Sequence, residues 1–240
     1  MKSLVIAIIL ISVSCAISIA GVYLEIWESI NNEEPIITYH SYENNIWKIE
    51  DTRGLSTIID FSKDKFIVVY EKEHIYSVNP LSDIIKDMRL AADSFIRDDQ
   101  GMRSEAKFKK IFKNKEVLNN IECDHYEIYE SGNKIEEIWL SKVKFLDQLE
   151  ALFSRLKQLG SPSDESSKKT NKDNEEIDKM IEGLGFPIKV ISYTTEGKII
   201  SEVKYAIEKE INTDDLKEPI GYDKVPIMEV YLRAYGEEGE

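Results

Sequence analysis

The sequence predicts an α+β fold in which helices cover an antiparallel sheet. Short segments rich in β-branched and aromatic residues recur about every ten residues, with polar turns between them. Two longer segments carry apolar residues at helical spacing instead, and each lies between two groups of strands. This alternation of strand groups and amphipathic helices is typical of a sheet with one covered face.

Residues 1–20 are predicted to form a signal peptide that is cleaved after Ala20. Lys2 supplies a positive start, residues 4–11 form an apolar run, and Ser18 and Ala20 place small side chains before the cleavage site. Two alternatives stay open, namely lipidation at Cys15 and retention of this run as an anchor. The run is short for a spanning helix and is interrupted by serines. We expect a periplasmic or extracellular protein whose mature form does not span a membrane.

The first strands are predicted from alternating apolar segments that end at Asn or Pro residues or at short polar connections. An amphipathic helix is predicted over residues 81–96, in which Leu81, Ile85, Met88 and Phe95 share one face. The six strand segments before it are 22–27, 36–40, 46–51, 56–60, 66–70 and 75–78.

A second group of strands is predicted from about Lys110 onward. A hairpin is expected around the turn 131–134, where Gly and Asn tolerate positive φ. A second covering helix is expected over 145–159 and a short one over 177–184, which Gly185 and Pro187 end. The strand segments of this half are 121–130, 135–140, 188–194 and 199–207.

Residues 21–230 are expected to form one domain. Within it, residues 161–176 contain no large apolar side chain and are predicted to be a disordered polar loop. Residues 231–240 are expected to form a flexible acidic tail, and residues 212–222 to be irregular.

The chain is acidic, with a formal net charge of −14, which disfavours nucleic acid as a partner. Cys123 is the only cysteine outside the predicted signal, so no disulfide is expected within the mature chain.

Four landmarks resemble an uncharacterised exported bacterial family, DUF4412, which is itself similar to the LolA/LolB-like outer-membrane lipoprotein carriers. Residues 118–128 resemble its "I-x-G-x-x-C-x-x-Y-x-V" strand, with Asn120 at the usual Gly. Residues 137–142 resemble its "E-I-W-V-T-K" strand, residues 185–189 its "G-x-P-L-K" segment, and residues 219–222 its closing "P-x-G-Y". Asn also tolerates a left-handed turn position, and the long polar loop is a further departure from the family.

The resemblance implies a sheet curled into an open half-barrel, with helices covering its concave face. In the carriers that face holds acyl chains, so the implied partner is a lipid or a lipidated protein. The candidate cavity residues are Trp27, Trp47, Trp139, Met88, Phe95 and Phe153, although packing beneath the helices would explain the same residues.

Catalytic chemistry has weaker support in the sequence. Cys123, His125 and Glu127 share one strand face, but same-face neighbours lie about 6.5–7 Å apart, too far for a direct thiol–imidazole hydrogen bond. The histidines His40, His74 and His125 are isolated, and no phosphate-binding loop or nucleophile elbow occurs. No catalytic residue, cofactor or metal is therefore assigned.

Three hypotheses follow for the function. The first is a non-enzymatic exported domain that binds a hydrophobic or amphipathic ligand. The second is a cell-envelope interaction or structural module with a closed core and a protein partner. The third is an enzyme that uses Cys123 and His125.

Overall fold

A computed structural model describes residues 21–88, 107–152, 176–195 and 197–236. The predicted signal peptide, Phe95, Phe153 and all but the last residue of the predicted polar loop lie outside this part of the chain.

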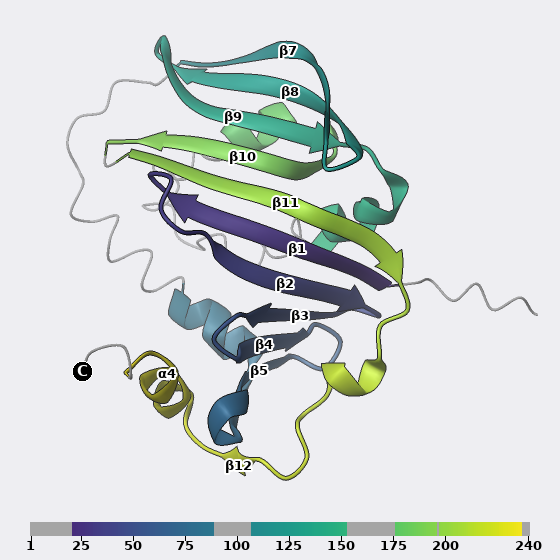
Figure 1. Ribbon diagram of the computed structural model, residues 1–240, viewed down its shortest axis with the longest axis vertical. Helices are drawn as coiled ribbons and strands as arrows, with labels where there is room; N and C mark the ends of the chain where they lie inside the picture. Colours follow the sequence, from purple (N-terminus) through teal and green to yellow (C-terminus); the bar gives the residue numbers. More distant parts are fainter. Residues whose placement is uncertain (1–20, 89–106, 153–175, 196, 237–240) are drawn as a thin grey trace, which may run out of the picture.

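The described strands form a single curved sheet of twelve strands whose ends do not meet (Figure 1). Its order is β12-β6-β5-β4-β3-β2-β1-β11-β10-β9-β8-β7, and every neighbouring pair is antiparallel except β12 with β6. The strands are β1 (Gly21–Ile30), β2 (Ile36–Glu43), β3 (Ile46–Asp51), β4 (Leu55–Asp60), β5 (Lys65–Tyr70), β6 (Ile75–Pro80), β7 (Phe108–Leu118), β8 (Ile121–Glu130), β9 (Asn133–Ser141), β10 (Phe186–Thr194), β11 (Gly197–Lys209) and β12 (Asp223–Lys224).

The first strand lies in the interior of the sheet and joins its two halves. β1 pairs with β2 on one side and with β11 on the other, from Gly21 opposite Lys209 to Ile30 opposite Ile199. The six strands β1–β6 form one meander and the five strands β7–β11 form the other. The β1–β11 pairing therefore makes one continuous sheet from the two meanders.

Asparagine pairs form three of the tight turns between these strands. Both residues of each pair have positive φ, which asparagine tolerates better than most residues with a Cβ atom. Asn120, at the position of the family's usual glycine, has φ of 66° and keeps the left-handed conformation expected there. The pairs are Asn31–Asn32, Asn44–Asn45 and Asn119–Asn120.

Helical segments occur where the sequence predicted them, over residues 81–88, 147–152 and 176–181 of the described chain. Short 3-10 helices, η1 (Glu71–Glu73), η2 (Lys144–Leu146) and η3 (Thr213–Leu216), connect other elements. No described helix is long and apolar enough to cross a membrane.

The helical segments pack on the same face of the sheet, which we call the helix face. It is the face on which β1 presents Val22, Leu24 and Ile26, because successive strand residues point to opposite sides. The main buried cluster combines Leu81, Leu146, Leu149 and Leu152 with these strand residues, and a second cluster packs Ile177, Ile181 and Leu184 against Ile138 and Leu140.

A C-terminal helix that was not predicted from the sequence, α4 (Ile227–Tyr235), extends over residues 231–235 of the segment expected to be a flexible tail. Val230 and Ala234 are buried against Val68 and Tyr70 of β5. Apolar side chains at helical spacing indicate this helix, but they lie directly before an acidic chain end that is typical of a solvated tail. The tail expectation was therefore wrong for residues 231–235. Residues 223–224, just after the segment expected to be irregular, form the short edge strand β12.

Candidate functional site

A cavity of about 720 Å³ lies between the helix face and two of the helical segments. We call it the helix-side cavity. Its sheet wall comes from five neighbouring strands in the middle of the sheet together with Leu140 of β9. The lining residues are Ile26, Glu28, Thr38, His40, Trp47, Ile49, Leu140, Glu150, Asp178, Lys179, Ile181, Glu182, Gly185, Phe186, Pro187, Ile188, Val190, Ser201 and Val203.

The wall of the helix-side cavity is mainly apolar because of strand alternation. Residues two apart on a strand share a face, so the helix-face positions of neighbouring strands form continuous apolar rows. Ile26 and Val203 are opposite each other on β1 and β11, and Trp47 and Ile49 extend the wall on β3. Cavities of this size and lining are typical of small-molecule binding sites.

His40 is a polar side chain within this mainly apolar wall. Its ring centroid lies 5.4 Å from that of Trp47, and its Nε2 shares a 3.0 Å hydrogen bond with the hydroxyl of Thr38. Burial lowers the pKa of His40 to about 4. The imidazole is therefore neutral at pH 7 and adds no positive charge to the cavity.

We expect this buried histidine to make the folded state sensitive to mild acid. Its pKa is about 4 in the fold and near 6.5 in an unfolded chain, so the unfolded state binds more protons between these values. Lowering the pH from about 6.5 to about 4 should reduce the unfolding free energy by about 2.5 kcal/mol through this residue. Urea unfolding of wild type and His40→Gln across this range checks it, and equal pH slopes in both proteins would contradict the assignment.

The predicted cavity residues fall in different places. Trp47 lines the helix-side cavity. Trp27 and Trp139 do not line it. Trp27 directly follows the lining residue Ile26 on β1, and Trp139 directly precedes the lining residue Leu140 on β9. Because successive strand residues point to opposite sides, both tryptophans lie on the other face of the sheet. Met88 is largely exposed, and Phe95 and Phe153 lie outside the described residues.

Sequence reasoning missed His40 and most of the aliphatic wall. Ile26 and Val203 looked like ordinary strand residues, because the sequence shows the alternation of a strand but does not show which of its faces meets the helices. The sequence does show that Ile26 and Trp27 are neighbours on one strand and therefore point to opposite faces of the sheet.

Cys123 is a buried thiol without a catalytic environment. It is 3 % exposed, its Sγ donates to the carbonyl of Ile121 at 3.4 Å, and burial raises its pKa to about 11. A thiol with such a pKa is protonated at neutral pH, whereas nucleophilic cysteines need the thiolate. The geometry therefore gives no support to an enzyme that uses Cys123 and His125.

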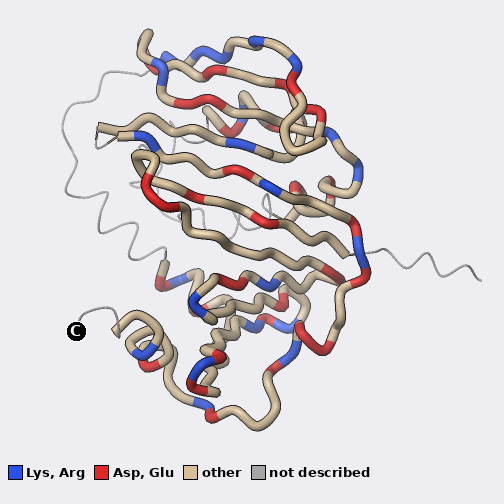
Figure 2. The backbone as a smooth tube through the Cα atoms, in the orientation of Figure 1, with Lys and Arg blue, Asp and Glu red and all other residues tan. Residues whose placement is uncertain are grey.

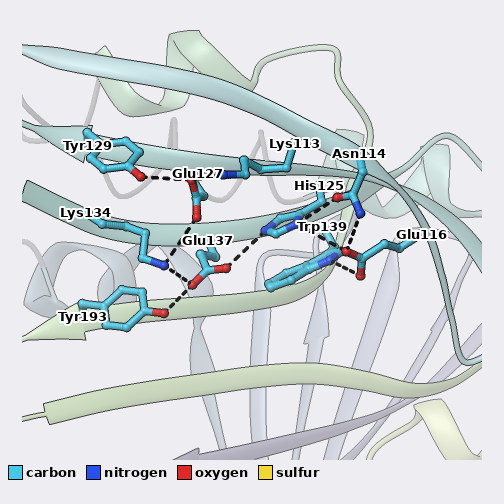
Figure 3. A network of polar contacts seen from close by, with 10 residues as sticks. All are labelled: Lys113, Asn114, Glu116, His125, Glu127, Tyr129, Lys134, Glu137, Trp139 and Tyr193. Carbon is cyan, nitrogen blue, oxygen red and sulfur yellow. Dashed lines mark hydrogen bonds and ion pairs between the residues drawn. The ribbon is translucent and has the colours of Figure 1, made fainter.

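His125 and Glu127 belong instead to a polar network on the face opposite the helices (Figure 3). The His125 ring stacks on Trp139 with centroids 4.0 Å apart, and its Nε2 lies 3.3 Å from a carboxylate oxygen of Glu137. The indole of Trp139 donates to Glu116 at 3.0 Å. The network joins side chains of β7, β8, β9 and β10, so its evident role is to hold this end of the sheet together.

Lysines compensate the buried carboxylates of this network. Lys134 lies between Glu137 and Glu127, at 2.6 and 3.5 Å, and Lys113 donates to Glu127 at 2.8 Å. The hydrogen bond from Lys113 is the main cause that lowers the pKa of Glu127 to about 2. Charged residues of both signs lie along the neighbouring strands of the sheet (Figure 2). Within the described residues, no group of three or more His, Cys, Asp or Glu side chains is arranged to hold a metal ion.

The described strands form the curved, unclosed, mainly antiparallel sheet that the sequence resemblance implied. The model of the family described as "Domain of unknown function (DUF4412)" matches residues 41–222. The chain therefore belongs to this family, which confirms the resemblance seen in its four landmarks.

Solved structures with a similar arrangement share little sequence with this chain. An uncharacterised conserved protein from Thermus thermophilus is 9% identical, with a TM-score of 0.45, over 86% of this chain and 90% of that one. The LolA superfamily protein NE2245 from Nitrosomonas europaea is 8% identical, with a TM-score of 0.29, over 83% and 90% of the two chains.

The Pseudomonas aeruginosa MucA/MucB complex contains a third similar chain, 6% identical with a TM-score of 0.40, over 88% of this chain and 59% of that one. No curated protein matches the sequence. These low identities and TM-scores leave the function to be inferred from the geometry of this chain.

Proposed function

We propose that this protein is an exported, non-enzymatic binding domain that holds a hydrophobic or amphipathic ligand in the helix-side cavity. The observation that carries the proposal is the cavity itself, about 720 Å³ with a mainly apolar wall. A sheet that needed only a packed core would bring its helices into full contact with this wall. The helical segments act in this proposal as a partial cover over a concave face.

Exposed apolar residues extend the wall beyond the cavity. Ile30, Ile36 and Ile199 are 56%, 55% and 42% exposed, and each lies two residues from a cavity-lining position on its strand. They therefore share the helix face, and Ile30 pairs directly with Ile199. An extended apolar ligand would cover this exposed surface.

Binding of an uncharged fluorescent apolar probe tests the proposal. Ser201 lines the cavity, whereas Ser41 follows the lining residue His40 on β2 and points to the other face. Ser201→Phe should reduce probe affinity at least about tenfold, equivalent to about 1.4 kcal/mol, because the ring occupies cavity volume. Ser41→Phe is the matched control and should bind like wild type. Equal affinities in all three proteins would refute binding in this cavity.

A protein-interaction module remains the second candidate, and the outer side of α4 favours it. Met228, Leu232 and Tyr235 follow one another at helical spacing and are 63%, 67% and 44% exposed. This candidate predicts that wild type forms a stable complex with an envelope protein and that the double variant Met228→Ser with Leu232→Ser does not. The double variant and wild type should not differ in their binding of the apolar probe.

A further inference from the structure

We propose that the helix-side cavity selects amphiphiles whose polar group is cationic over those whose polar group is anionic. This inference rests on the proposed ligand-binding function and adds the charge of the ligand to it.

Three carboxylates that line the cavity form no ion pair within the part of the chain that the structure describes. Glu28 comes from β1, Glu150 from the helical residues 147–152, and Glu182 follows the helical residues 176–181. Among the described residues, none of the three forms an ion pair or a side-chain hydrogen bond. They approach the cavity from both the sheet side and the helix side, so a ligand between these elements meets negative charge on both sides.

The remaining charged groups do not reverse this balance. Lys179 is the one basic residue in the described lining, and the acidic Asp178 lines the cavity next to it. The buried imidazole of His40 is neutral at pH 7, so it offers no positive charge to an anionic headgroup. Among the described residues, the charged lining side chains are therefore four acids and one base.

Two carboxylates on the opposite face of these strands have lysine partners, so the excess of unpaired acidic groups among the described residues is a feature of the cavity side. There Glu202 lies 3.0 Å from Lys189 and 2.7 Å from Lys204, and Glu137 lies 2.6 Å from Lys134. These two carboxylates are paired with lysines, whereas the three glutamates at the cavity form no ion pair among the described residues. Leaving several negative charges around an apolar cavity disfavours an anion by repulsion and favours a cation by attraction.

Three surfactants with the same dodecyl chain and different polar groups test the inference. Dodecyltrimethylammonium, dodecyl maltoside and dodecyl sulfate would be titrated calorimetrically, below their micelle concentrations, into protein purified from the exported fraction. Circular dichroism would confirm that the fold persists. We expect the cationic compound to bind at least about tenfold more tightly than the anionic one, with the neutral compound between them. The preference should shrink between about 0.1 M and about 1 M salt, as screening increases.

A triple variant assigns the preference to the cavity. Glu28→Gln with Glu150→Gln and Glu182→Gln should remove most of the discrimination between the cationic and the anionic compound. The matched control is Glu130→Gln with Glu208→Gln and Glu210→Gln, which changes the net charge equally at three residues that do not line the cavity and form no ion pair in the described structure. The control should retain the preference.

The outcomes separate this inference from the function on which it rests. If none of the three surfactants binds, the proposed ligand-binding function fails. If the maltoside binds but the cationic and anionic compounds bind equally, or the anionic one binds more tightly, the charge inference alone is overturned. Equal loss of preference in both triple variants would also overturn it, because the effect would then belong to the overall charge of the protein.

Discussion

Replacing Gly185 with alanine is expected to destabilise the protein by more than about 3 kcal/mol. Gly185 has φ of 117°, a conformation that essentially only glycine adopts, and a Cβ atom there would lie 2.2 Å from the carbonyl oxygen of Ser141. Because that neighbour is backbone of β9, the clash is relieved only by moving the strand or the entry to β10. The same residue lines the helix-side cavity, so ligand binding should weaken as well.

Gly183 is a matched control two residues away. It also has positive φ, at 69°, but a Cβ atom there would meet nothing within 4 Å. Gly183→Ala should therefore cost only about 1 kcal/mol, from backbone conformation alone. Urea unfolding of the two variants measures the difference, and similar losses in both would show that contact with Ser141 is not the cause.

Leu146→Ala is expected to cost about 3 kcal/mol, the second largest effect. Leu146 lies in η2, has no exposed surface, and belongs to the main cluster between the helical segments and the sheet. Truncation removes its contacts and leaves a void that a close-packed core fills only in part. At this chain length the melting temperature should fall by about 6–12 °C.

Leu232→Ala on α4 makes the same chemical change at a side chain that is 67% exposed. It should change stability by less than about 0.5 kcal/mol. A comparable loss in both variants would mean that Leu146 does not connect the helices to the sheet as the structure places it.

The local elements of this fold were predictable from the sequence because each depends on neighbouring residues. Alternation identified the strands, the apolar stripe from Leu81 to Ile85 identified a helix, and Asn120 fitted its left-handed turn. The pairing of β1 with β11 was not predictable in this way, since it joins residues more than 150 positions apart and no local pattern encodes the partner.

The site was less predictable than the fold for a related reason. Trp27, Trp47 and Trp139 are all strand tryptophans, and only the register of the complete sheet shows that Trp47 faces the helices while the other two do not. A shift of one position moves a side chain from one face to the other, so aromatic content alone could not select the cavity residues. α4 was missed because a short amphipathic segment next to an acidic end resembles a solvated tail.

Photoaffinity mapping tests the central claim most directly, namely that a ligand occupies the helix-side cavity. An amphiphile with a photoreactive group on its apolar chain would be crosslinked to the protein, and the labelled residues identified by mass spectrometry. We predict labelling of Ile26, Trp47 or Val203, which line the cavity, and its loss in Ser201→Phe. Labelling confined to Trp27 or Trp139 on the opposite face, or undiminished in Ser201→Phe, would contradict the claim.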